Sequence, residues 1–405
     1  MSPTPGLVVV GAGLAGAKAV EAARESGFHG RVVLVGDETG PPYERPPLSK
    51  AVLRGDQELD VTRVHPDGYY DTHDIELVAG TVTRVDPNTR HVELADGTTI
   101  AFSSLILATG AEPRRLGVPG ADLDGIHYLR TGTDSLRLRD KIRQATRVAV
   151  IGAGWIGSEV AASARQMGAD VVLIDPLDVP LQRVLGNRIG TVFGRLHADA
   201  GVELRLGTGV SELRGTDTVE AVLLDDGRVE PADLVVAGIG VIPRIDLAAA
   251  AGLRIDNGVV VDQYLETDTP GIYAVGDIAN AWHPHYGAHL RVEHWANALN
   301  QGLTAGRNAT GSRNPYTRLP YFFSDQYDLG MEYVGHGSPT DEVAIRGDLD
   351  EREFIAFWHR DGRVTAAMNV NVWDVVEDLK TIIERNHLID PVRLSDPDTP
   401  LGTLT

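Results

Sequence analysis

The chain has 405 residues, no cysteine and a formal net charge of −20. This length predicts two or three domains with sizeable cores, and the charge argues against nucleic acid or an anionic membrane as a partner. Without cysteine there is no redox-active disulfide and no thiolate ligand for a metal cluster, so redox chemistry must belong to a bound organic cofactor.

The N-terminal residues MSPTPG lack the charged region of a signal peptide. No apolar run approaches the roughly 18 residues of a membrane-spanning helix. We therefore expect a cytoplasmic protein with no membrane partner.

The first motif, residues 7–16 (LVVVGAGLAG), predicts a buried strand that runs into a glycine-rich turn, with a helix over 17–25. Gly11 allows the tight turn, Gly13 lets the backbone approach a pyrophosphate, and Gly16 lets helix and strand pack closely. The helix N-terminus adds N–H donors and the positive end of its dipole. The pattern indicates a dinucleotide site, and a glycine-rich turn in an ordinary open sheet is the alternative.

A second strand is expected over 31–35, and Asp37 follows it. An acid at this position can accept a hydrogen bond from a ribose hydroxyl. The succession of strand, glycines, helix, strand and acid strengthens the dinucleotide interpretation considerably.

A proline-rich loop comes next, residues 40–50 (GPPYERPPLSK). Its prolines predict an extended chain with neither helix nor inner strand before Leu48. A rigid loop after a cofactor strand is well placed to contact the cofactor, and Lys50 ends it. The alternative for Lys50 is a solvated surface lysine.

Three short strands are expected over 75–79, 81–86 and 91–94, separated in part by turns. We expect them to form a small antiparallel segment within a parallel-sheet domain. They lead into residues 105–110 (LILATG), an apolar strand that ends on small residues. Such an end suits the close approach of a ligand at the carboxyl edge of the sheet.

An internal repeat then appears, because residues 147–157 (RVAVIGAGWIG) copy the first motif. A helix over 158–167 and a strand over 171–174 follow, and Asp175 comes next. Two complete motifs argue for two dinucleotides. A carboxylate at Asp175 accepts from a free 2′-hydroxyl and repels a 2′-phosphate, so NADH is favoured over NADPH. Residues 234–240 (LVVAGIG) supply the strand and turn that complete the second unit.

Beyond Pro243, residues 269–279 (TPGIYAVGDIA) predict a strand that runs into Gly276 and Asp277, and a helix is expected over 295–308. Asp277 could accept from a ribityl hydroxyl or could serve as a helix cap. We expect three nearby histidines to be surface loop residues, because their spacing does not fit a helical metal pair: His283, His285 and His289.

The C-terminal segment predicts strands over 343–346, 353–359 and 363–369, the last two joined as a hairpin. An amphipathic helix is expected over 372–384. The tail beyond Pro391 is expected to be an extended cover or a loose end.

Together these motifs resemble the FAD-dependent ferredoxin reductases of oxygenase systems, the group that includes putidaredoxin reductase and the reductases of aromatic-ring dioxygenases. The similarity extends over essentially the full length. The matching segments are GAGLAG at 11–16, RPPLSK at 45–50, LILATG at 105–110, GAGWIGSE at 152–159, TPGIYAVGDIA at 269–279, EHWANALNQG at 293–302 and PYFFSDQYD at 320–328. One departure is Phe323, where many relatives carry tryptophan.

The resemblance implies an α/β fold with two Rossmann-like dinucleotide-binding domains and a C-terminal α+β domain. The FAD-binding domain would comprise 1–113 and 245–315, the inserted NAD(H)-binding domain 114–244, and the C-terminal domain 316–405.

The resemblance also places site residues. Positions expected to contact FAD are Ala15, Asp37, Lys50, Val82, Arg130, Asp277 and Trp295, within motifs that add Gly11, Gly13, Leu14, Gly16, Ala108, Thr109, Gly110, Gly276, Glu293 and His294. Positions expected to contact the nicotinamide nucleotide are Gly154, Ile156, Glu159, Asp175 and Gly240, within a motif that adds Gly152, Trp155 and Gly157.

The implied activity is hydride transfer from NADH to FAD, followed by single-electron transfer to a [2Fe–2S] ferredoxin that feeds an oxygenase. We expect Lys50 and Glu159 to form an ion pair beside the flavin, with Glu159 also positioning the nicotinamide carboxamide. The alternative for Glu159 is an exposed acid in the first turn of a helix. The helix that begins near Trp295 would direct its positive end at the flavin, and an ordinary core aromatic is the alternative for Trp295.

Two other functions stay open at this stage: a flavin-dependent NADH oxidase or peroxide reductase, and a signalling flavoprotein resembling apoptosis-inducing factor. Docking of an acidic ferredoxin on so acidic a chain would need a local positive patch. Candidates are Arg307, Arg313 and Arg318, with scattered surface arginines as the alternative.

Overall fold

The computed structural model describes residues 5–404, and the chain divides into two compact units. The first comprises Met1–Glu44, Asp60–Glu112 and Ile242–Pro320, and the second comprises Arg45–Leu59, Pro113–Val241 and Tyr321–Thr405. The connecting strands β7 (Ala111–Pro113) and β16 (Val241–Pro243) pair with each other. The finer division into FAD, NAD(H) and C-terminal domains stays a prediction.

The first unit is built on a sheet in the order β3-β2-β1-β6-β5-β4, with β18 also paired to β6. The strands are β1 (Gly6–Val10), β2 (Val32–Gly36), β3 (Ile75–Ala79), β4 (Val82–Asp86), β5 (His91–Leu94), β6 (Thr99–Leu107) and β18 (Ile272–Ala274). Every residue of β1 and β2 is buried, as central parallel strands require.

The expectation that residues 75–79 belong to the antiparallel segment is wrong, because β3 pairs in parallel with β2. Within this sheet the antiparallel pairs are those of β4 with β5 and of β5 with the first part of β6. The physical reason lies in the connections. The long crossover from β2 to β3 permits parallel pairing, whereas the tight turns between β4, β5 and β6 enforce antiparallel pairing.

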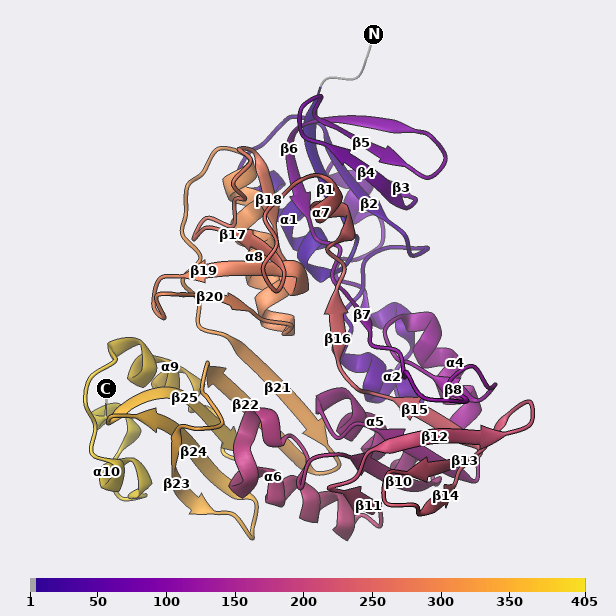
Figure 1. The fold of residues 1–405 in the computed structure, drawn as a ribbon. Helices are drawn as coiled ribbons and strands as arrows, with labels where there is room; N and C mark the ends of the chain where they lie inside the picture. The colour runs from indigo at the N-terminus through magenta and orange to yellow at the C-terminus, as the bar shows by residue number, and fades with distance from the viewer. Residues whose placement is uncertain (1–4, 405) are drawn as a thin grey trace. The chain divides into compact units, whose positions relative to one another are not determined.

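Two helices of the first unit, α1 (Leu14–Glu25) and α8 (Trp295–Ala309), lie side by side (Figure 1). Their backbones approach closely because α8 presents glycines to α1. A Cβ atom at Gly302 would stand 2.3 Å from the Ala15 carbonyl oxygen, and one at Gly306 would stand 2.2 Å from that of Ala19. The remaining elements are α3 (Tyr69–Thr72), α7 (Asp246–Ala250), the short 3-10 turns η2 (Leu59–Thr62) and η3 (Gly276–Ile278), and the sheet β17 (Val259–Val261), β19 (Ala279–His283) and β20 (Ala288–Arg291).

The expectation that His283 is a surface loop residue is wrong. It is the last residue of β19, only 3% exposed, and its Nε2 atom lies 3.0 Å from the Arg318 carbonyl oxygen. Strand alternation explains this, since neighbouring Trp282 is exposed while His283 faces inward. His289 is exposed, as expected, but it lies in β20 and not in a loop, whereas His285 is half-buried in the turn between β19 and β20.

The second unit contains a parallel sheet in the order β11-β10-β9-β15-β8, which repeats the β1–β2 arrangement in β9 and β10. Its strands are β8 (Ile126–His127), β9 (Arg147–Ile151), β10 (Asp170–Asp175), β11 (Glu203–Leu206) and β15 (Leu234–Ala237), beside an antiparallel sheet of β12 (Val210–Gly215), β13 (Val219–Leu224) and β14 (Val229–Pro231). Its helices here are α2 (Ala51–Arg54), α4 (Gly132–Ile142), α5 (Trp155–Gln166) and α6 (Gln182–Asp199).

The proline-rich loop is not extended up to Leu48. A 3-10 turn, η1 (Pro46–Ser49), begins two residues earlier. Proline is well suited to the first positions of a helical turn, because its fixed φ fits and its missing N–H has no intrahelical partner there.

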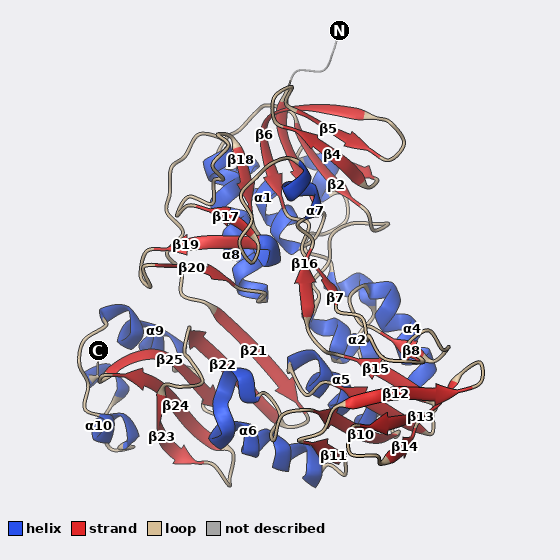
Figure 2. Cartoon of the chain, in the orientation of Figure 1, coloured by secondary structure: helices blue, strands red, loops and turns tan. Residues whose placement is uncertain are grey.

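The C-terminal part of the second unit is an antiparallel sheet in the order β21-β22-β25-β24-β23 with α9 packed beside it (Figure 2). The elements are β21 (Tyr321–Gln326), β22 (Leu329–Gly335), β23 (Glu342–Asp348), β24 (Glu353–Arg360), β25 (Arg363–Val370), α9 (Val376–Arg385), α10 (Pro391–Ser395) and η4 (Leu401–Thr403). The expected hairpin joins β24 to β25. Side chains of α6 share a hydrophobic cluster with this sheet, around Trp358 and Phe193.

Two C-terminal expectations need correction. The helix begins at Val376 and not at residue 372, because Asn371 and Asp374 adopt left-handed φ angles of 51° and 62° that a helix cannot include. The tail beyond Pro391 is not simply extended, since α10 begins there, with the Asp390 carboxylate accepting from the Val392 N–H. Across residues 5–404, no helix has both the length and the apolar character needed to span a bilayer.

Candidate functional site

The first glycine motif forms a cradle at the carboxyl end of β1. Gly11 has a φ of 114°, and a Cβ atom there would stand 2.1 Å from the Ala108 carbonyl oxygen. A Cβ atom at Gly16 would stand 2.0 Å from the Gly11 carbonyl oxygen, so strand and helix meet without room for a side chain. Gly13, by contrast, faces open space and is the N-cap of α1, with no side-chain cap. The uncapped N–H groups of α1 therefore border a space that suits a pyrophosphate.

The second motif repeats this geometry in the second unit. Gly152 has a φ of 102°, and a Cβ atom there would stand 2.4 Å from the Gly238 carbonyl oxygen. A Cβ atom at Gly157 would stand 1.8 Å from the Gly152 carbonyl oxygen, while Gly154 faces open space and caps α5 without a side chain. The chain thus contains two cradles of the same design.

The two acids expected to bind ribose have different partners. Asp175 accepts hydrogen bonds from the N–H groups of Ala153, at 2.7 Å, and Leu177, at 2.9 Å, which fix its carboxylate beside the second cradle. Asp37 lies just after β2, and its Oδ2 atom is 2.8 Å from Nη2 of Arg244. Arg244 is itself anchored at the end of β6, where its N–H donates to the Gly110 carbonyl and its carbonyl accepts from the Thr109 hydroxyl.

The second unit also contains the ion pair expected between Lys50 and Glu159. Lys50 Nζ lies 3.0 Å from Glu159 Oε1, and the two side chains are 12% and 6% exposed. Glu159 is therefore not an exposed first-turn acid, and Lys50 is not a solvated lysine. Lys50 Nζ also lies 5.4 Å from the centre of the Phe323 ring.

Two serines complete the surroundings of Glu159. Ser324 on β21 donates to Oε1 at 2.7 Å, and Ser49 at the end of η1 donates to Oε2. The Ser49 carbonyl in turn accepts from the Ser163 hydroxyl on α5, and the Leu48 carbonyl accepts from the Ser135 hydroxyl on α4, both at 2.7 Å. The end of the proline-rich loop is thus fastened to two helices and to the glutamate.

Several other expected site residues lie on the elements around the first cradle. The Gly276 N–H donates to the Gln301 side chain at 2.8 Å. Asp277 lies inside η3, whose N-cap is Val275, so it is not the cap of that turn. Glu293 pairs with Arg291, and Trp295 is the first residue of α8, whose N-cap is His294.

Among the predicted site residues that belong to the second unit, the Arg130 carbonyl accepts from the Arg45 guanidinium, Ile156 is 46% exposed, and Gly240 has a φ of 96°. The residues expected to contact FAD thus lie in the first unit, and those expected to contact the nicotinamide nucleotide lie in the second. Lys50 and Arg130 are the exceptions, because they belong to the second unit although both were expected to contact FAD.

Two of the arginines considered for a positive patch have partners in the first unit. Arg307 Nη2 lies 3.6 Å from Glu25 Oε2, and Arg313 Cζ lies 4.2 Å from the centre of the Tyr264 ring. The neighbouring acid partly cancels the charge of Arg307.

Sequence reasoning did not single out Ser49, Ser324 or Arg244. Ser49 and Ser324 lie inside two segments that carry the family resemblance, RPPLSK and PYFFSDQYD, which was the available signal. Nothing local marked Arg244, because its partner Asp37 is more than 200 residues away in the sequence.

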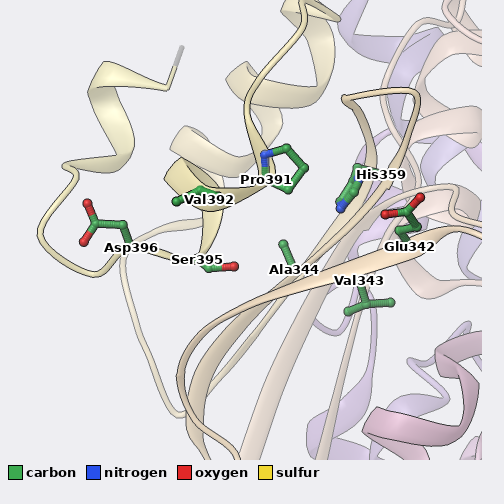
Figure 3. A pocket seen from close by; sticks show the side chains of 8 residues that line it. All are labelled: Glu342, Val343, Ala344, His359, Pro391, Val392, Ser395 and Asp396. Atoms are coloured by element: carbon green, nitrogen blue, oxygen red, sulfur yellow. The ribbon is translucent and has the colours of Figure 1, made fainter.

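A cavity of about 530 Å³ lies between β23, β24 and α10, and none of the predicted site residues lines it (Figure 3). Glu342 and His359 are cross-strand partners at one end, and Asp396 lies at the other. Within residues 5–404 no three histidine or acidic side chains gather as a metal site. The nucleotide cradles, with their glycine geometry and fixed acids, are the functional candidates.

Two Rossmann-like cradles in one chain are the architecture of a protein that binds two dinucleotides. The family model described as pyridine nucleotide-disulphide oxidoreductase matches residues 5–302, and the model described as reductase C-terminal matches residues 321–405. The chain belongs to this pyridine nucleotide-disulphide oxidoreductase family.

Its relatives include rhodocoxin reductase of Rhodococcus erythropolis, which is 41% identical over 90% of this chain and 86% of its own length. The ferredoxin–NAD(+) reductase component of an anthranilate 1,2-dioxygenase system of Burkholderia cepacia is 38% identical over the full length of both chains. Among solved structures, a covalent putidaredoxin reductase–putidaredoxin complex matches with a TM-score of 0.95 and 36% identity, covering 100% of this chain and 98% of that one.

Members of this family use FAD and a nicotinamide dinucleotide, and the two cradles fit these groups. The open space at Gly13 and at Gly154, over an uncapped helix N-terminus in each case, is what a pyrophosphate needs. The acid at the end of each second strand suits a ribose hydroxyl.

Proposed function

We propose that this chain is an FAD-dependent reductase that takes electrons from NADH and passes them singly to a [2Fe–2S] ferredoxin serving an oxygenase. The observation that carries the proposal is the presence of two matching nucleotide cradles in a chain without cysteine. A second dinucleotide site is needed only if electrons enter from a nicotinamide nucleotide, and the lack of cysteine excludes a thiol as the next carrier. The named partners of the relatives, rhodocoxin and putidaredoxin among them, support a ferredoxin as the acceptor.

Bound FAD would supply the conversion of a two-electron hydride donor into single electrons. The protein's own part is orientation and electrostatics. In the first unit, Gly11, Gly13 and the N-terminus of α1 would hold the pyrophosphate of FAD, with Asp37 at the adenosine ribose. In the second unit, Gly154 and Asp175 would hold NADH, and Asp175 would exclude the 2′-phosphate of NADPH.

Lys50 and Glu159 carry the polar part of the proposed reaction site. A buried ammonium and carboxylate stabilise each other, and each would be costly alone. We assign Glu159 the positioning of the nicotinamide carboxamide and Lys50 the charge beside the flavin. No general base is required, because hydride transfer moves no separate proton. A cytoplasmic location stays a prediction from the sequence.

The deciding experiment is reduction of cytochrome c by the purified flavoprotein, with NADH or NADPH, in the presence and absence of a [2Fe–2S] ferredoxin. We expect strong ferredoxin-dependent reduction that prefers NADH. NADH oxidation by oxygen alone, indifferent to every ferredoxin supplied, would instead indicate an oxidase. Slow reduction with a long-lived charge-transfer complex would indicate a signalling flavoprotein.

A further inference from the structure

Glu159 is held by three donors that come from different parts of the second unit. Lys50 Nζ and the Ser324 hydroxyl both donate to Oε1, and the Ser49 hydroxyl donates to Oε2. Glu159, Ser49 and Ser324 are 5%, 2% and 1% exposed, so water does not compete for these bonds. A carboxylate accepts about four hydrogen bonds, and the three present among the described residues leave one acceptor position, on Oε2.

The hydroxyl of Ser324 is itself oriented. Gln326, also 1% exposed, directs its Nε2 atom to Ser324 Oγ at 3.4 Å, which leaves the serine proton free to point at Glu159. Both residues lie on β21, where buried positions alternate with more exposed ones. Strand pairing with β22 therefore fixes where the hydroxyl stands.

We propose that Ser324 and Ser49 are positioning residues that lock the Glu159 carboxylate in one rotamer, with its last acceptor position available to the nicotinamide carboxamide. This inference rests on the proposed function, since it presumes that a nicotinamide nucleotide binds at the second cradle. Lys50 alone cannot fix the carboxylate, because its flexible side chain lets the ammonium group move together with the carboxylate. Two short hydroxyls on rigid elements remove that freedom.

The test compares the binding of two dinucleotides to the FAD-loaded protein by calorimetry. NAD⁺ carries the carboxamide NH₂ group, whereas 3-acetylpyridine adenine dinucleotide carries a methyl ketone and cannot donate to Glu159. We expect the wild type to bind NAD⁺ more tightly. Ser324→Ala should lower the ratio of the dissociation constant of the acetylpyridine analogue to that of NAD⁺ by about three- to tenfold, the worth of one ordinary hydrogen bond in a protein.

Three further variants make the result specific. Ser324→Thr keeps the hydroxyl and should restore the ratio, and Ser49→Ala should lower it through the other oxygen. Ser135→Ala is the matched control, because it removes a buried hydroxyl that holds the same loop at the Leu48 carbonyl without touching Glu159. It should reduce thermal stability and leave the ratio unchanged.

An unchanged ratio in Ser324→Ala, or an equal change in Ser135→Ala, would overturn the proposal, and so would a wild-type ratio of one. If Ser324→Ala yields no folded flavoprotein, Ser49→Ala decides in its place. The proposed function fails separately: a protein that shows the expected binding ratios and gives no ferredoxin-dependent electron transfer refutes the reductase and not the serine pair.

Discussion

Arg244 reaches across the carboxyl edge of the first sheet to Asp37, with its Nη2 atom 2.8 Å from Asp37 Oδ2. Both side chains are about two-fifths exposed, at 43% and 40%. Asp37 is the acid proposed to bind the adenosine ribose of FAD, close to the pyrophosphate. The guanidinium therefore offsets a carboxylate that would otherwise repel an anionic cofactor.

We expect Arg244→Gln to raise the dissociation constant of FAD by about two- to fivefold, in keeping with the small worth of a partly exposed pair. Titration of the apoprotein with FAD, followed by quenching of flavin fluorescence, measures this. Arg84→Gln is the control, since it removes another exposed arginine–aspartate pair, that of Arg84 and Asp86, from the same unit. Equal affinities in the two variants would contradict the prediction.

Substitutions at the glycines of the two cradles should show which of them are needed for cofactor binding and which for folding. Gly13→Ala adds a methyl group to open space, so the melting temperature of the apoprotein should stay within about 2 °C while FAD is lost. Gly16→Ala drives a methyl group into the Gly11 carbonyl and should destabilise the fold by about 1–3 kcal/mol or more.

Gly154→Ala is the counterpart in the second unit. It should keep bound FAD and lose affinity for NAD⁺, which calorimetry and the visible flavin spectrum report together. Loss of FAD from Gly154→Ala, or retention of FAD by Gly13→Ala, would show that the cradles have been assigned to the wrong dinucleotides.

The buried pair of Lys50 and Glu159 should be costly to break on one side only. Lys50→Met leaves an almost fully buried carboxylate without an opposite charge, with an expected loss of about 3–5 kcal/mol in the free energy of unfolding. Lys50→Met with Glu159→Gln should recover much of that loss, because the uncompensated charge is gone. Urea-induced unfolding of the three proteins measures the difference, and equal losses in single and double variants would refute the argument.

Asp175 should select between the two nicotinamide nucleotides. Asp175→Asn removes the charge and keeps the size of a side chain that accepts from Ala153 and Leu177. We expect kcat/KM for NADPH relative to NADH to rise by about tenfold, because the repulsion of the 2′-phosphate disappears. Asp37→Asn makes the same change at the first cradle and should leave the ratio unaltered.

His197 should make the protein more sensitive to acid. Burial lowers the pKa of His197 to about 4, although the neighbouring Gln326 side chain offsets part of this shift by raising the pKa. Since the unfolded chain binds a proton near pH 6.5 and the folded one does not, stability falls as the pH drops from about 6.5 to 4.

This difference in proton binding should lower the free energy of unfolding by about 2 kcal/mol between pH 7 and pH 5. His197→Gln should therefore lose less stability over this range than the wild type in urea titrations at the two pH values. His29→Gln replaces an exposed histidine and should behave as the wild type does. A pH dependence in His197→Gln as steep as in the wild type would show that other groups dominate.

Local backbone requirements could be predicted from the sequence. The turn at Gly11 and the close contact at Gly16 depend on residues only a few positions apart, so the motif already specifies the cradle, and its repeat at Gly152 specifies a second. The absence of cysteine likewise fixed the kind of redox chemistry that was possible.

Tertiary structure decided most contacts between distant segments; the pair of Lys50 and Glu159 was predicted only because the family resemblance covers both segments. Ser324 meets Glu159 across 165 positions, and Arg244 meets Asp37 across more than 200, so no local pattern marks either pair. The parallel pairing of β3 was mispredicted because the long crossover from β2 was not foreseen, and the burial of His283 because the inward face of β19 was not foreseen. A glycine's conformation is set by its own chain neighbours, whereas the partner of a side chain is set by whichever surface the fold brings against it.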